Sequence, residues 1–342
     1  MRVLKQLPEK IRLAEGGGGE ATANLIREVF WSRLANPELL RGNDAAVLKN
    51  PGGRLALTTD SFVITPWRFP GGDIGRLAIC GTINDLTVMG AKVLGLAAAF
   101  IIEEGFSADS LTEISQSLAN TAREAGVFVV TGDTKVVNRG AADGIFITTT
   151  GLGVIDEGIV LGGEMARPGD RVLISGTMGD HGAAVMLARG ELGIESGLQS
   201  DAAPLNSLLL PLIEEYHDSL RVMRDPTRGG LAATLNEIAR QSQVGIRLDE
   251  KVIPVRPEVR GITDLLGLDP LYLANEGKAI IVAAPQIAEE LVTRLHRHPL
   301  GQAAAIIGEV TAAHPGMVSL QTTAGGERIL LMGSGEQLPR IC

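Results

Sequence analysis

Two long stretches of the chain, residues 54–160 and 171–335, repeat one pattern in which short apolar runs of strand length alternate with runs of helical period. This alternation predicts a mixed α/β fold in which helices cover sheets. The turn cluster at 167–170 (Arg-Pro-Gly-Asp) separates the two stretches, and 342 residues suffice for two cores. We therefore predict a glycine-rich segment at 1–40, domains at 41–160 and 168–334, and a mobile tail at 335–342.

Charge and hydropathy exclude several classes of protein. The net charge is −9 and the pI is about 5.2, which disfavours a nucleic-acid binder. The longest apolar run, Val93–Ile102, is about half of a membrane span, and no apolar signal-peptide core precedes Glu15. We expect a cytoplasmic protein without membrane contact. The two cysteines, Cys80 and Cys342, rule out a disulfide framework or a cysteine-rich zinc site.

Four aspartates lie beside small or turn-prone residues. Asp60 and Asp133 each follow an apolar strand, where α/β folds commonly bind ligands. Asp85 lies on an otherwise apolar helical stripe between residues 74 and 89, a costly place for an unpaired carboxylate. Asp44 stands in the turn-like GNDAAV. Each alone is compatible with a cap or turn role, but together they favour Mg²⁺ held between carboxylates and nucleotide phosphates.

Glycine-rich segments enter two predicted helices. One runs from Ser175 to Gly182 after a strand, and the other from Asp225 to Leu231, with Asp225 as the expected N-cap. Such helix entries bind anions, although ordinary capping explains them equally well. The candidate ligand-contacting residues are Gly176, Gly179, Asp225, Gly229 and Gly230. The run at 16–19 matches a dinucleotide fingerprint only loosely, and we expect a mobile glycine loop there.

Two further residues have chemical potential. Glu276, in Asn-Glu-Gly-Lys before an apolar strand, is either a base or a solvated carboxylate. Cys342 ends the chain, so its thiol is expected to be exposed and nucleophilic as the thiolate, which Arg340 favours. An extended tail of about seven residues reaches roughly 23 Å, enough to enter a site on its own domain or on a partner's.

The ending Pro-Arg-Ile-Cys resembles the C-terminal signature of the HypE family of hydrogenase maturation factors. The internal motifs TTDSFVITP, FPGGDIGRLAICGTINDL, VTGDTKVV, SGTMGDHGA, DPTRGGL and NEGK agree with it over residues 10–342. The acid and glycine motifs are shared with aminoimidazole ribonucleotide (AIR) synthetase and related ATP-using enzymes. The resemblance implies a two-domain AIR-synthetase-like (PurM-like) fold whose N-terminal sheets pair into a barrel in a homodimer. One departure is Glu15, where relatives often carry histidine.

The resemblance also implies a reaction. The carbamoyltransferase HypF places a carbamoyl group on Cys342, ATP drives its dehydration to a thiocyanate, and the cyanide passes to iron on a HypC–HypD scaffold. Mg²⁺ would be held by the four aspartates, Asp44, Asp60, Asp85 and Asp133. Lys135 would stabilise charge on the reacting oxygen or a phosphate, and Glu276 would remove the amide protons.

Two alternatives stay open. A synthetase of the same superfamily that acts on a free small molecule would leave the terminal cysteine unexplained. A selenophosphate synthetase usually carries a reactive cysteine or selenocysteine in its N-terminal region. Here the first cysteine, Cys80, lies in an apolar helical stretch, which indicates a structural role. A non-enzymatic thiol carrier would explain Cys342 but not the acid and glycine motifs.

Overall fold

The computed structural model describes residues 8–17, 19–41, 45–49, 51–190, 193, 196–333 and 340–342. Its N-terminal half is built on a four-stranded sheet in the order β1-β6-β4-β5, so that β1 and β5 are the two edges. Only the β4–β5 pair is parallel. The strands are β1 (Arg54–Phe62), β4 (Ala91–Glu103), β5 (Val129–Val137) and β6 (Ile145–Ile155).

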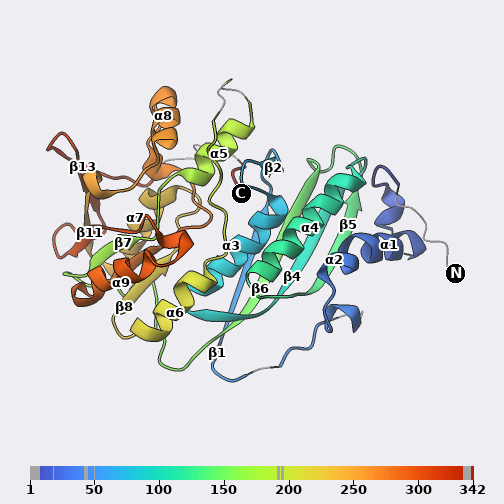
Figure 1. Ribbon diagram of the computed structural model, residues 1–342, viewed down its shortest axis with the longest axis horizontal. Coiled ribbons are helices and arrows are strands. Elements are labelled where there is room, and N and C mark those ends of the chain that lie inside the picture. Colours follow the sequence, from blue (N-terminus) through green and yellow to red (C-terminus); the bar gives the residue numbers. More distant parts are fainter. Residues whose placement is uncertain are drawn as a thin grey trace.

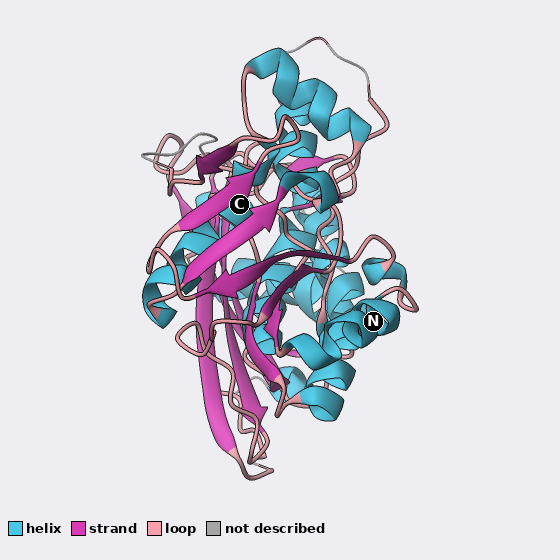
Figure 2. Ribbon diagram, turned by 90° about the vertical axis from the view of Figure 1, so that its left-hand side faces the viewer, coloured by secondary structure: helices cyan, strands magenta, loops and turns pink. Residues whose placement is uncertain are grey.

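Helices α3 (Ile74–Val88) and α4 (Ala108–Glu124) cover one face of this sheet (Figure 2). Local sequence explains where both begin. Asp73 caps α3 by accepting hydrogen bonds from the N–H groups of Gly75 and Arg76, and Ser107 caps α4. Nearly all of α3 is buried because it lies between the two sheets, where Figure 1 shows it at the centre of the molecule.

A seven-stranded, mostly antiparallel sheet forms the second half, in the order β13-β12-β9-β11-β7-β10-β8. Hydrophobic cores lie on both of its faces, and one also packs against α3. Its strands are β7 (Arg171–Ile174), β8 (Leu220–Arg224), β9 (Gly245–Asp249), β10 (Ile280–Ala283), β11 (Ala305–Thr311), β12 (Val318–Gln321) and β13 (Glu327–Ile329).

The helices of this half are α5 (Asp180–Ala188), α6 (Asn206–Tyr216), α7 (Gly230–Ser242), α8 (Pro257–Leu266) and α9 (Ala288–Leu295). The sequence-based expectation of a glycine-opened helix after β7 agrees with α5, whose N-cap is Gly179. The two halves are joined through Asn84 of α3. Its amide donates to the carbonyls of Ala203 and Glu276, and its carbonyl oxygen accepts from the N–H of Leu205.

The N-terminal segment is not one continuous helix. It divides into α1 (Gly19–Leu25), a π-helical turn (Ile26–Trp31) and α2 (Ser32–Leu34). Such π-helical insertions are rare and occur frequently at functional sites. Glu15 is buried and bonded to Arg12, a local structural role at the residue where relatives often have histidine.

The last three residues are docked rather than exposed. The N–H of Val63, just after β1, donates to the carbonyl of Cys342, and the N–H of Thr65 donates to that of Arg340. The tail therefore runs antiparallel to the segment after β1, close to β2 (Arg68–Phe69) in Figure 1. Ile341 is only 4% exposed and belongs to the N-terminal core, and Cys342 is partly buried, so the thiol is less exposed than expected. Residues 335–339 of the predicted mobile tail lie outside the described residues.

Candidate active site

An acidic cluster forms between the two halves, starting with Asp60 and Asp85. Asp60 of β1 points to the helix-covered face of the sheet, the same face as Thr58, whose hydroxyl donates to Asp85 Oδ2 at 2.7 Å. Burial, with the neighbouring carboxylate of Asp85, raises the pKa of Asp60 to about 6. The apolar stripe of α3 packs against the sheet and thus places Asp85 beside Asp60, the residue predicted to share its site.

The second half contributes Asp225 and Glu276 to the same cluster. Burial, then the charges of Asp85 and Asp60, raises the pKa of Asp225 to about 7. Glu276 is 2% exposed, and burial raises its pKa well above the ordinary value, with Asp225 adding to the effect. Its Oε1 atom is buried without a hydrogen-bond partner. The cluster therefore holds more negative charge than its protein surroundings compensate.

This arrangement fits a hard cation. Carboxylates that repel one another and carry an unpaired buried oxygen are stabilised by Mg²⁺, which prefers oxygen ligands and keeps several water or phosphate ligands. Among the described residues of one chain, no three acidic, histidine or cysteine side chains converge closely enough to hold an ion by themselves. Phosphate oxygens would have to complete the coordination. Asp44 lies outside the described residues.

Asp133 and Lys135 do not join this cluster within one chain. Pairing places Asp60 opposite Thr149, Thr149 opposite Ala98, and Ala98 opposite Gly132, so Asp133 falls one residue off this row and points to the other face. The three intervening strand spacings amount to about 14 Å. The sequence pattern predicted Asp133 at the end of a strand, but it lies in the middle of β5. It forms an exposed ion pair with Lys135 at 3.4 Å.

A pocket of about 200 Å³ opens beside this ion pair. It lies between the edge strand β5 and the N-terminal segment, and most of its exposed surface is apolar. The π-helical turn supplies Phe30 and Trp31 to its wall, and Gly16 presses closely on β5. A Cβ atom at Gly16 would lie 2.5 Å from the Val136 nitrogen, so the close approach requires glycine. The pocket is therefore a small, mainly apolar recess at the β5 edge.

The predicted glycines have clear packing roles. Gly229 and Gly230 have φ values of +77° and +60°, and a Cβ at Gly230 would lie 2.5 Å from the Leu273 carbonyl. A Cβ at Gly176 would lie 2.6 Å from Cε of Lys278. The expectation that Asp225 caps the following helix was wrong. Helix α7 is capped by Gly229, because the left-handed glycine pair delays its start and frees Asp225 for the acidic cluster.

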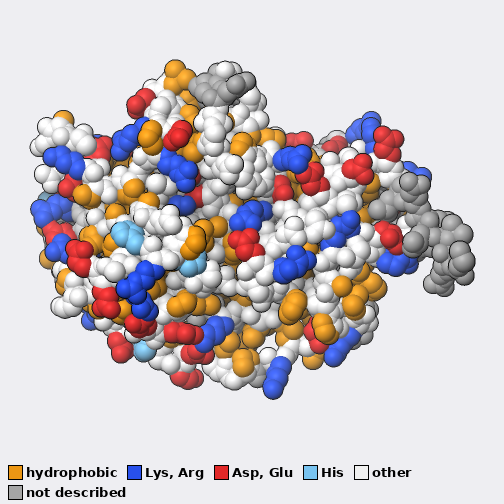
Figure 3. Space-filling view, viewed as in Figure 1, with side chains coloured by type: hydrophobic (Ala, Val, Ile, Leu, Met, Phe, Trp, Pro, Cys, Tyr) orange, Lys and Arg blue, Asp and Glu red, His pale blue; other side chains and the backbone are white. Residues whose placement is uncertain are grey.

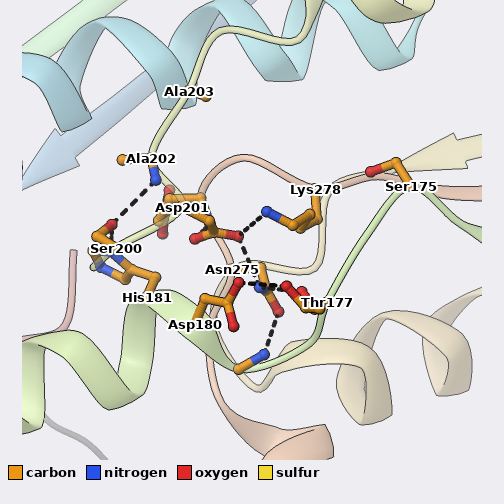
Figure 4. Close-up of polar contacts among 12 residues, drawn as sticks. Ser175, Thr177, Asp180, His181, Ser200, Asp201, Ala202, Ala203, Asn275 and Lys278 are labelled. Carbon is orange, nitrogen blue, oxygen red and sulfur yellow. Dashed lines mark hydrogen bonds and ion pairs between the residues drawn. The ribbon is translucent and has the colours of Figure 1, made fainter. Parts of the chain in front are cut away.

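A polar network beside the cluster was not predicted from the sequence (Figure 4). Asp201 forms a buried ion pair with Lys278 and accepts from the Asn275 side chain and the Glu276 N–H. Burial opposes ionisation of Asp201, but Lys278 and these donors outweigh it and lower its pKa. Asp201 stands in Ser-Asp-Ala-Ala, an acid beside small residues. That signal singled out the four predicted aspartates and would also have found Asp201.

Next to it, Asp180 accepts from the Thr177 hydroxyl and pairs with Arg256. Burial, then the charge of Asp201, raises the pKa of Asp180 to about 6. His181, which follows on α5, contacts both Ser200 and the docked tail. The network therefore extends from the backbone of Glu276 to the residue before Cys342.

The two cysteines differ sharply. Cys80 is fully buried in α3, and burial raises its pKa far above the ordinary value, so it is not a reactive thiol. Cys342 is only partly buried and packs at the margin of the N-terminal core. This contrast agrees with a structural role for Cys80 and leaves Cys342 as the thiol available for chemistry.

The face in Figure 3 mixes acidic and basic side chains without an extended basic patch. No described helix has the length and hydropathy needed to cross a bilayer.

Comparison with known proteins defines the class. Residues 42–155 and 167–320 match the N-terminal and C-terminal domains of the AIR synthase related proteins. The fold of the two halves is thus that of an AIR-synthase-like protein.

Within this class the chain belongs to the HypE family. It is 50% identical over 333 residues to the carbamoyl dehydratase HypE of Rhizobium leguminosarum bv. viciae, covering 97% of this chain and 95% of that protein. The crystal structure of a HypE protein in complex with ATP superposes with a TM-score of 0.93 at 48% identity, covering 97% and 99% of the two chains. A structure of a HypE–HypF complex matches with a TM-score of 0.79 at 47% identity, covering 90% and 99%. The family and fold predicted from the motifs are confirmed.

Proposed function

We propose that this protein dehydrates a carbamoyl group carried on Cys342 to a thiocyanate at the expense of ATP. The observation that carries the proposal is the docked tail. Cys342 pairs with Val63, three residues beyond Asp60 on the same extended segment, or roughly 10 Å along it. The acidic cluster thus lies within reach of the only thiol that is not fully buried.

The dehydration would take place in two steps. The thiocarboxamide oxygen attacks the γ-phosphorus of ATP, ADP leaves, and one amide proton is lost, which gives an S-bound imidate phosphate. The C–O bond then breaks as phosphate leaves, the second N–H proton is lost, and the carbon–nitrogen bond becomes triple. Phosphorylation is needed because an amide oxygen is a poor leaving group.

The residues of the acidic cluster would have different roles in this reaction. Asp60 and Asp85 would hold Mg²⁺, with Asp44 as a further candidate and Asp225 extending the negative field. Bound Mg²⁺ would neutralise phosphate charge during transfer. Glu276 would accept the amide protons, because its raised pKa suits a base that works near neutral pH. The tether raises the local concentration of the carbamoyl group at the cluster. Gly176 and Gly179 would shape the loop before α5 rather than contact the nucleotide.

We further propose that the complete site forms between two copies of the chain. The acidic cluster lies at the β1 edge and the apolar pocket at the β5 edge of the same sheet. Unpaired edges require cover, and β1 also exposes Leu55 and Leu57, at 57% and 72%. Pairing β1 with β5 of a second copy would bring the partner's pocket, with the partner's Asp133 and the partner's Lys135 at its rim, beside Asp60. The pocket would take the adenine.

Mixed dimers test this arrangement. At a Mg²⁺ concentration too low to support Asp85→Asn, a subunit carrying this change and a subunit carrying Lys135→Ala are each expected to be inactive alone. After mixing, each heterodimer regains one intact site, so about a quarter of the wild-type activity per dimer returns when half of the dimers are mixed. A mixture that stays inactive although the heterodimer forms would place both residues in a site within one chain.

The partners follow from the same assignment. A HypF-type carbamoyltransferase would supply the carbamoyl group, as the HypE–HypF complex of a related protein supports. The cyanide would pass to iron on a HypC–HypD scaffold during hydrogenase maturation in the cytoplasm. The domain limits that we propose remain 41–160 and 168–334, flanked by the N-terminal segment and the tail.

Mass spectrometry of the C-terminal peptide tests the activity directly. The protein is first carbamoylated with HypF, carbamoyl phosphate and Mg-ATP and is then freed of nucleotide. One sample then receives Mg-ATP, and the control sample does not. A carbamoyl adduct on Cys342 that loses the mass of water only with ATP supports the proposal, and Cys80→Ala should behave like the wild type. No adduct on Cys342 would favour a synthetase that acts on a free small molecule. An adduct that never dehydrates would leave only a thiol carrier.

A further inference from the structure

We propose that His181 is a positioning residue that holds the C-terminal tail at the site, with Ser200 fixing which ring nitrogen carries the proton. Its effect on the reaction rests on the proposed function, but its effect on the tail does not. The geometry sets a hydrogen-bond relay across three parts of the chain: α5, the loop at residue 200 and the last residues of the tail.

The contacts determine the state of the ring. Nε2 of His181 lies 2.8 Å from the carbonyl oxygen of Ile341, which can only accept, so Nε2 carries a proton. Nδ1 lies 2.8 Å from Oγ of Ser200. That hydroxyl oxygen already accepts from the N–H of Ala202, so its own proton is available for Nδ1. The relay therefore runs from the Ser200 hydroxyl through a neutral ring to the Ile341 carbonyl.

The surroundings keep the ring neutral and in place. His181 is completely buried, and burial lowers its pKa despite the opposing charge of Asp201. Phe69 and His181 form a T-shaped pair, with ring centroids 5.3 Å apart and an interplanar angle of 88°. A buried ring that is packed against Phe69 and bonded through both nitrogens is held in one orientation, so it can hold the tail in a single position.

The tail has other contacts, and these show what His181 adds. Arg340 is bonded through its guanidinium to the Val63 carbonyl, and its own carbonyl accepts from Arg189 at 3.1 Å. The side chain of Ile341 packs into the N-terminal hydrophobic core. These contacts lie at least one residue upstream of the thiol, apart from the main-chain bond of Val63. The His181 bond is made by the carbonyl directly before Cys342 and is thus placed to fix the residue that carries the substrate.

Alkylation of Cys342 measures this role. The full chain, without nucleotide or carbamoyl donor, is treated with iodoacetamide, and the C-terminal peptide is quantified over time. His181→Ala is expected to alkylate about fivefold faster, the equivalent of one lost hydrogen bond. His181→Asn, which can still donate to a carbonyl, should recover part of the protection. The matched control is His296→Ala, because His296 Nε2 bonds the Ala304 carbonyl at 2.9 Å far from the tail.

A stability cycle separates positioning from simple core packing. His181→Ala is introduced into the full chain and into a chain that lacks residues 340–342, and both are unfolded in urea. If His181 acts through the tail, the mutation costs less in the shortened chain. Equal destabilisation in both chains, or wild-type alkylation of a folded His181→Ala protein, would overturn the proposal. Neither assay requires ATP or carbamoylation, so failure of the proposed function would leave both readouts interpretable.

In the complete reaction, single-turnover dehydration of the carbamoylated protein should slow in His181→Ala while its affinity for ATP stays unchanged. His181→Asn should restore part of the rate. A parallel loss of ATP affinity would mean that His181 supports the nucleotide site and not the tail.

Discussion

Nζ of Lys278 lies 3.2 Å from Oδ2 of Asp201, and both side chains are less than a tenth exposed. Asp201 also accepts the N–H of Glu276, so this pair fixes the backbone of the proposed base. Lys278→Met would leave a buried carboxylate without its cation, which costs about 3–5 kcal/mol of unfolding free energy. Urea unfolding measures it, with Lys251→Met as the exposed control. A loss below about 1 kcal/mol would contradict a buried, fully charged pair.

Asp85→Asn tests the proposed cation site. Asparagine keeps the shape and an acceptor for the Thr58 hydroxyl but removes the charge. We expect the Mg²⁺ concentration for half-maximal ATP hydrolysis to rise at least about tenfold, or 1.4 kcal/mol. The control is Asp156→Asn, which removes an exposed partner of Lys92. Unchanged ATPase activity and Mg²⁺ dependence in Asp85→Asn would remove Asp85 from the site.

Glu276→Gln should change the pH dependence of stability in the absence of Mg²⁺ and nucleotide. The folded-state pKa of Glu276 is raised, so its stabilising contribution is fully present below the unfolded value, about 4.3, and is lost as pH rises through the folded value. Wild-type stability should therefore fall from pH 4 toward neutrality, and Glu276→Gln should flatten this fall.

At pH 8 the variant should be more stable than the wild type by at least about 1 kcal/mol, which corresponds to less than one pKa unit. Urea unfolding across the pH range measures the difference, and Glu327→Gln, at an exposed site, should leave the profile unchanged. The variant should still accept a carbamoyl group on Cys342 but fail to dehydrate it. A Glu276→Gln protein that is less stable at pH 8 would show that the buried carboxyl is compensated in the folded state.

Gly16→Ala tests the pocket at the β5 edge. The new Cβ would lie 2.5 Å from a backbone nitrogen of Val136, so the N-terminal segment must move away from β5 and open the pocket. We expect ATP affinity to fall at least about tenfold. Gly17→Ala is the matched neighbour, because its nearest atom is 3.6 Å away. Quenching of Trp31 fluorescence, measured in a Trp67→Phe background, reports the binding. Equal affinity in both variants would place the nucleotide elsewhere.

Much of the fold could be read from periodicity and capping. Asp73 before an apolar helical stripe and Ser107 before an amphipathic one mark real helix starts, because capping is a local property of a few adjacent residues. The start of α7 was misplaced because Asp225-Pro has the local form of a cap, while tight packing of Gly230 against Leu273 decides where the helix begins. The π-helical turn at Ile26–Trp31 likewise has no local signal in the sequence.

The site shows the same division. Asp60 and Asp85 could be paired from their patterns, since one lies near a strand end and the other on a stripe that must face that strand. Asp133 has an equally suggestive motif, yet sheet register turns it to the opposite face. The local signal of an acid beside small residues also marks Asp201, but its role depends on Lys278 and Asn275, which are far away in the chain.

The family, the α/β alternation, the acidic and glycine motifs and the terminal Pro-Arg-Ile-Cys all follow from the sequence alone, because each is a pattern of neighbouring residues. Only the tertiary structure decided which acids meet, which edge bears the pocket, and where the tail docks. Those outcomes depend on strand order, on the two-residue alternation of faces along a strand, and on contacts such as His181 to Ile341 that join residues 160 positions apart.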